Sequence, residues 1–172
     1  MPQGWDNQLD SEMGINVAYL HKWRHVYNMD KKRQYEFGKH GGFILGNVYS
    51  LASVGAMARW GTHLKTDIGP PTISPGFTGM PVFRPSPQFN WYLFGGVEVR
   101  AVARNIFLDG NTVEESHSIE KNNFVADLQF GAVFQFQDMR ISIGNILRSK
   151  EFETQKEPAR YGAINITIYT SK

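Results

Sequence analysis

The chain has 172 residues, of which 41% are hydrophobic and 13% aromatic, and its formal net charge is +2. This length suits a single domain spanning residues 1–172. The small charge argues against a nucleic-acid partner, and the absence of cysteine excludes a disulfide or a thiolate site. No apolar run reaches the roughly 18 residues of a transmembrane helix, and residues 1–6 lack the basic-then-apolar pattern of a signal peptide.

Seven segments are expected to form antiparallel β-strands, and in five of them apolar residues alternate with polar residues or glycine at a period of two. A helix repeats every 3.6 residues and would not separate these side chains onto two faces. Short polar connections between several segments favour hairpins. The expected strands are Gly14 to Tyr27, Tyr35 to Leu45, Ser50 to Gly61, Asn90 to Phe107, Phe124 to Phe136, Met139 to Lys150 and Arg160 to Tyr169.

The alternation is typical of a transmembrane β-barrel, with an apolar outer face and a polar lumen. A soluble antiparallel barrel or sandwich alternates in the same way with its apolar face inside, so the pattern alone leaves both folds open. Facing lipid we expect Trp91, Leu93, Val97, Val99, Phe124, Leu128, Phe130, Ile141, Ile143, Ile164 and Ile166. Facing the lumen, as a charge network, we expect Glu98, Arg100, Arg104, Asp127, Arg140 and Arg148.

Two long connections interrupt the expected strands. His63 to Gln88 is rich in proline and glycine, which predicts an irregular loop; its apolar residues Ile73, Phe77, Met80, Val82 and Phe83 suggest packing against the barrel mouth. Leu108 to Asn123 contains His117 among carboxylates and hydroxyls, which indicates a solvated loop.

The histidines and carboxylates of the N-terminal part give little catalytic signal. His21 and His25 are four residues apart, and on a strand this spans about 13 Å, so they cannot share a metal ion. We expect them at the membrane interface and His40 in a hydrogen bond of the lumen. Asp10 and Glu12 are hard oxygen ligands, but without a third ligand they predict a solvated turn.

Seven strands do not make a closed bacterial barrel, which normally has an even strand number, and hydrocarbon tolerates no open sheet edge. We therefore expect further strands upstream of this segment. If the last strand ends on the periplasmic side, loops 108–123 and 151–159 lie outside and the proline-rich loop lies inside.

Several separated motifs resemble the C-terminal portion of the LpxR-type lipid A 3′-O-deacylase family. They occur in the family's order along essentially the whole chain. The motifs are Trp5 to Glu12 with Tyr19 and Lys22 to Arg24, Leu45 to Tyr49 with Gly55 and Arg59, Val97 to Asn105 with Leu108 to Asn111, and Arg148 to Phe152 with Tyr161 and Gly162.

The resemblance implies a twelve-stranded outer-membrane barrel that hydrolyses the 3′-acyloxyacyl ester of lipid A with the help of calcium. The family's catalytic histidine and calcium ligands precede the segment that matches Trp5, Gln8 and Glu12, so these three are adjacent to the site and have no assigned role. No catalytic or metal-binding residue is assigned in this chain. The resemblance thus implies that residues 1–172 alone are inactive and need a missing N-terminal half or a second chain. A non-catalytic barrel module that binds lipid or a partner is the alternative.

Overall fold

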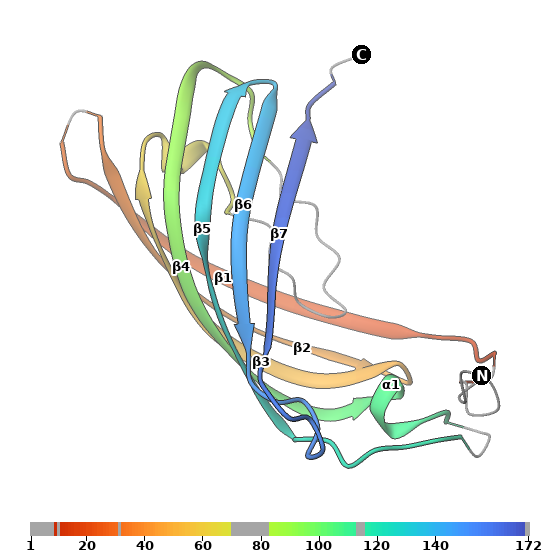
Figure 1. Ribbon diagram of the computed structural model, residues 1–172. Helices are drawn as coiled ribbons and strands as arrows, with labels where there is room; N and C mark the ends of the chain where they lie inside the picture. The colour runs from red at the N-terminus through yellow and green to blue at the C-terminus, as the bar shows by residue number, and fades with distance from the viewer. Residues whose placement is uncertain (1–8, 10, 31, 70–82, 113–115, 171–172) are drawn as a thin grey trace, which may run out of the picture.

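A computed structural model describes residues 9, 11–30, 32–69, 83–112 and 116–170 of the chain. They form one antiparallel sheet of seven strands in the order β1 to β7, so each strand lies beside its neighbours in the sequence (Figure 1). The strands are β1 (Asn16–Asn28), β2 (Gln34–Gly46), β3 (Tyr49–Gly61), β4 (Ser86–Asn105), β5 (Phe124–Gln137), β6 (Met139–Arg148) and β7 (Ala159–Ile168).

Two short helical segments, η2 (Leu64–Thr66) and α1 (Ile106–Asp109), precede and follow β4. In the part of the chain that the structure describes, no helix has the length and apolar character needed to cross a membrane. The main elements of the described residues are the seven strands of one sheet, so the expected all-β fold is confirmed.

The boundaries of β4 differ from those expected. This strand starts at Ser86, inside the segment expected to be a loop. Ser86 pairs with Gln137 of β5, and an irregularity in the register separates this pair from the regular pairing that begins at Asn90. Pro87 lies within this irregularity, where its missing N–H does not interrupt a regular ladder. At the other end, Phe107 belongs to α1 and not to the strand. The Asn105 side chain accepts a hydrogen bond from the Phe107 backbone N–H at 3.1 Å and so begins the helix.

The sheet is strongly curved and has a convex and a concave face (Figure 1). Val97 is 51% exposed, whereas Arg100, on the opposite face of the same strand, is 3% exposed. Charged side chains therefore line the concave face, and aliphatic and aromatic side chains cover the convex one. This is the arrangement of a membrane barrel and the reverse of a soluble one.

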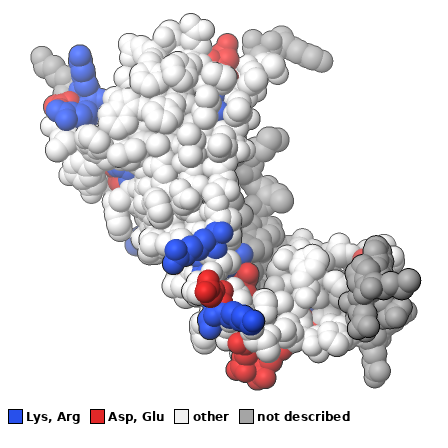
Figure 2. Space-filling model, in the orientation of Figure 1, with Lys and Arg blue, Asp and Glu red and all other residues white. Residues whose placement is uncertain are grey.

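Aromatic side chains gather on the convex face near the end of the sheet that carries the β1–β2 and β5–β6 turns. The ring centroids of Tyr27 and Tyr35 lie 5.0 Å apart, and those of Trp60 and Trp91 lie 5.1 Å apart. Rows of aromatic residues are typical of the membrane interface of a barrel. Figure 2 shows charged side chains mainly near the two ends of the visible face, with a largely uncharged band between them.

Part of the proline-rich connection folds onto the concave face. Leu64 is fully buried there and packs with Tyr92, Phe94 and Val133 in the small apolar core. Phe83 is also buried and forms an isolated β-bridge with Asp67. The other apolar residues expected to pack at the barrel mouth, Ile73, Phe77, Met80 and Val82, lie outside the described residues.

The sheet remains open at both edges within the described residues. There β1 pairs only with β2, and β7 pairs only with β6. The up-and-down strand order places the β3–β4 connection at one end of the sheet and the β4–β5 and β6–β7 connections at the other. Which end faces the periplasm stays a prediction.

Candidate functional site

The carboxylate of Glu12 joins three segments that are far apart in the sequence. Its Oε1 accepts a hydrogen bond from Asn47 Nδ2 at 2.8 Å, in the β2–β3 turn. Its Oε2 accepts from the Thr112 backbone N–H at 2.8 Å and from Asn111 Nδ2 at 3.2 Å, in the connection that follows α1. We call Glu12, Asn47, Asn111 and Thr112 the Glu12 clasp.

The strand ends position the clasp through backbone contacts. Asn47 Oδ1 accepts from the Ile15 N–H at 2.7 Å, and Asn47 Nδ2 also donates to the Met13 carbonyl at 2.7 Å. Arg104, at the end of β4, donates to the Asn47 carbonyl at 2.7 Å and to Thr112 Oγ1 at 2.9 Å. Arg104 therefore supports the clasp. Among the described residues, its hydrogen bonds go to Asn47, Gly110 and Thr112 and not to the carboxylates of the predicted lumen network.

These hydrogen bonds lower the pKa of Glu12 from its ordinary value of 4.5 to about 2, with the Thr112 backbone N–H as the largest cause. Since the folded pKa is depressed, the clasp contributes fully above pH 4.5 and is lost as the pH falls to about 2. We expect a ¹³C NMR titration of the Glu12 carboxyl to have its midpoint near pH 2, and Asn47→Ala to raise that midpoint. A midpoint near 4.5 in the unaltered protein would contradict the clasp.

Glu12 is the only one of the three site-adjacent residues whose surroundings are described. Trp5 and Gln8 lie outside the described residues, as does Asp10. The sequence singled out Glu12 by resemblance but did not identify its partners, which are separated from it by 35 to 100 residues.

Four of the residues predicted to form a lumen charge network, Glu98, Arg100, Asp127 and Arg148, contact one another on the concave face. Asp127, on β5, accepts from Arg100 Nη2 at 2.9 Å and from Arg148 Nε at 2.8 Å. Glu98 lies 3.8 Å from Arg100 and pairs with His40 Nε2 at 2.8 Å. These residues form one chain of contacts across β2, β4, β5 and β6, and His40 lies in the lumen hydrogen bond expected for it.

A second group of charges lies at the other end of the concave face and includes Arg140. Glu36 accepts from Arg24 Nη2 at 2.6 Å and from Arg59 Nε at 3.0 Å. Asp67, from the proline-rich connection, lies 3.2 Å from Arg140 Nε. Sequence reasoning missed Glu36 and Asp67. The alternation along β2 could have placed Glu36 on the inward-facing side. Asp67 lies in an irregular segment, where no alternation predicts the direction of a side chain.

The remaining histidines show no catalytic arrangement within the described residues. His21 and His25 point to the convex face, as their alternation with inward residues requires. The His21 ring lies 4.3 Å from the Trp23 ring, which fits an interfacial role. For His40, the described neighbours provide a carboxylate but no hydroxyl hydrogen-bonded to its ring.

A calcium ion does not fit the described residues. No group of three or more histidine, aspartate or glutamate side chains among them is arranged to hold a metal ion. Both oxygens of Glu12 already accept hydrogen bonds from amide groups. The described residues therefore show no cluster of carboxylates of the kind that often binds calcium.

The apolar convex wall, the charged concave wall and the up-and-down strand order define this protein as a transmembrane β-barrel protein. Comparison with protein families matches residues 1–170 to the family described as outer membrane protein LpxR. The chain belongs to this LpxR family.

The solved structure of LpxR from Salmonella typhimurium has the same fold. The TM-score is 0.82 and the sequence identity is 20%, over 96% of this chain and 55% of that protein. The chain thus spans about half the length of the protein that it matches. No curated protein matches the sequence.

Proposed function

We propose that this chain forms the C-terminal seven strands of an outer-membrane barrel that hydrolyses the 3′-acyloxyacyl ester of lipid A. The observation that carries the proposal is the family match over residues 1–170. The structural likeness, which covers nearly all of this chain but about half of the matched protein, supports the assignment to one portion of such a barrel. Lipid A in the outer membrane is the proposed substrate.

In this proposal the Glu12 clasp holds residues 12–15 against one end of the barrel. Ester hydrolysis needs a base, a nucleophile and a group that stabilises the oxyanion. We propose that the histidine base and the calcium ligands lie on strands upstream of Trp5, which pair with β1 and β7. Glu12 then acts as a positioning residue whose hydrogen bonds to Asn47 and Thr112 fix the end of that segment.

The proposal predicts that residues 1–172 alone have no deacylase activity. The physical reason is that the described residues offer no base beside a nucleophile, and that two open edges leave backbone groups unpaired. The chain is refolded in detergent with calcium and lipid A, and the released acyl product is sought by mass spectrometry. We expect no product from this chain and recovery of product when the upstream strands are added.

The result that would overturn this prediction is acyl product from residues 1–172 alone that disappears when one histidine is replaced. His40→Ala is the first variant to make, because His40 is the histidine whose ring lies 2.8 Å from a carboxylate. His25→Ala, on the convex face, is its matched control.

The alternative is a non-catalytic barrel module that binds lipid or a partner chain, and the open edges of β1 and β7 favour it. An extended chain that forms a closed barrel, binds lipid A and releases no acyl product would support this alternative. In that case an upstream segment or a second chain still pairs with β1 and β7 and completes the sheet.

A further inference from the structure

A row of inward-facing residues crosses the first four strands at one level of the concave wall. Lys22 is paired in register with His40, His40 with Gly55, and Gly55 with Glu98. A Cβ atom at Gly55 would collide with the His40 ring. Glycine therefore lets the imidazole lie across β3 and reach Glu98 on the far side, at 2.8 Å.

Lys22 differs from the arginines of this wall because it has no carboxylate of its own. Within the described residues its ammonium group makes no hydrogen bond or ion pair. The carboxylate that attracts it electrostatically is that of Glu98, which is hydrogen-bonded to His40 and lies near Arg100. Five arginines, in contrast, contact carboxylates. Arg24 and Arg59 contact Glu36, Arg140 contacts Asp67, and Arg100 and Arg148 contact Asp127.

The concave wall consequently carries more positive than negative charge. Apart from Arg104 at the rim, the described strands contribute Lys22 and five arginines, against Glu36, Glu98, Asp127 and the loop residue Asp67. Glu151, in the β6–β7 connection, also contacts Arg148, so six cations face five carboxylates. An excess of positive charge inside a concave, partly enclosed surface attracts anions.

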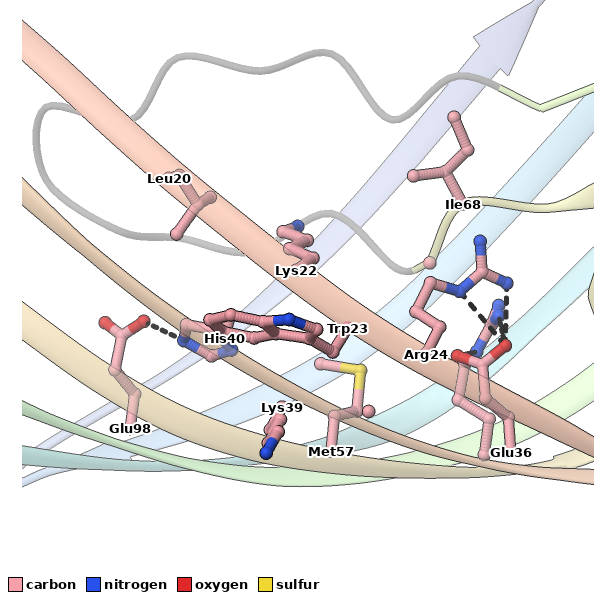
Figure 3. A pocket seen from close by; sticks show the side chains of 13 residues that line it. Leu20, Lys22, Trp23, Arg24, Glu36, Lys39, His40, Met57, Ile68 and Glu98 are labelled. Atoms are coloured by element: carbon pink, nitrogen blue, oxygen red, sulfur yellow. Dashed lines mark hydrogen bonds and ion pairs between the residues drawn. The ribbon is translucent and has the colours of Figure 1, made fainter.

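A cavity of about 50 Å³ lies beside Lys22, between the His40–Glu98 pair and the Arg24–Glu36 pair (Figure 3). Since a water molecule needs roughly 10–15 Å³ of such volume, the cavity has room for a group of about three to five non-hydrogen atoms. A carboxylate has three such atoms and a phosphate has five. Leu20, Met57 and Ile68 give the rest of the lining an apolar character.

We propose that this cavity is a binding site for an oxyanion, a carboxylate or a phosphate, held by Lys22 from the lumen side. A charged hydrogen bond to the ammonium group supplies the attraction, while at the other side Glu36 balances the charge of Arg24. The apolar lining favours an anion that also carries a hydrocarbon portion. The lining contains none of the residues of the Glu12 clasp, and the inference, which concerns anion binding, goes beyond the proposed function.

The test measures binding to the refolded chain in a non-ionic detergent by calorimetry, with two probes. These are inorganic phosphate and [1-¹³C]octanoate, whose carboxyl resonance is followed by NMR. Octanol, which has the chain but no charge, is the negative probe. We expect at least one of the two oxyanions to bind and octanol not to bind; the preferred oxyanion identifies the natural class of ligand.

Variants assign the binding to Lys22. Lys22→Met keeps the length of the side chain without its charge and should weaken binding at least about tenfold, whereas Lys22→Arg should retain it. Lys32→Met is the matched control, because Lys32 is exposed in the β1–β2 connection and does not line the cavity.

The inference is wrong if neither oxyanion binds, or if Lys22→Met and Lys32→Met affect binding equally. Neither result depends on deacylase activity, because no ester is present in the assay. Failure of this site and failure of the proposed function are therefore distinguishable.

Discussion

Replacement of Asp127 with alanine is expected to lower the free energy of unfolding by about 3–5 kcal/mol. Asp127 accepts hydrogen bonds from both Arg100 and Arg148, and all three side chains are at most 9% exposed. Without the carboxylate, two guanidinium groups stay enclosed by the wall and lose their nearest acceptor. Glu98, 3.8 Å from Arg100, and Glu151, 3.4 Å from Arg148, compensate for this loss only in part. The cost comes mainly from these uncompensated charges.

Urea unfolding of the chain refolded in detergent or lipid vesicles measures this effect. Glu153→Ala is the matched control, since it also removes one negative charge but at an exposed position in the β6–β7 connection. We expect the control to change the free energy of unfolding by less than about 0.5 kcal/mol. Equal effects of the two substitutions would show that the buried network does not contribute as described.

Replacement of Val97 with arginine is expected to cost about 2–4 kcal/mol in a lipid bilayer. Val97 lies near the middle of β4 on the convex face and is 51% exposed, between Ala56 on β3 and Leu128 on β5. In the membrane this exposed surface contacts hydrocarbon, where a guanidinium group loses its hydration. The size of the effect therefore reports the depth of the residue in the bilayer.

The control is Val97→Thr, which has a similar shape and no charge, and both variants are compared by urea unfolding in vesicles. A loss of stability for the arginine variant that is no larger than that for the threonine variant would mean that this face does not contact lipid. A substitution at Arg100, on the concave face, would not make this test. It would remove a charge and break the ion pair with Asp127 at the same time.

The strands and the two faces of the sheet could be predicted from the sequence because their signal is local. Val97 and Arg100 fall on opposite faces for any register, since successive side chains on a strand point to opposite sides. The ends of β4 were less predictable. The shift in register at Ser86 and the helix start at Asn105 depend on contacts with β5 and on a cap, and not on the period of the strand.

The candidate site was predictable only in its components. Resemblance drew attention to Glu12, and alternation placed Glu98 and Asp127 on the inner wall. The Glu12 clasp joins residues that are 35 to 100 positions apart in the sequence. His40 and Glu98 are 58 positions apart, and Asp67 and Arg140 are 73 positions apart. Such contacts depend on register and on the path of the connections, which no local pattern contains.

The sequence by itself determined an antiparallel β-fold, its apolar and charged faces, and the absence of cysteine chemistry, because these follow from composition and a period of two. Only the tertiary structure decided which charges meet. Strand register set Gly55 opposite His40 and Glu98, and the folding of residues 64–69 onto the concave face brought Asp67 to Arg140. Pairing of charges requires distances of a few ångströms, and only the curved sheet brings distant residues that close.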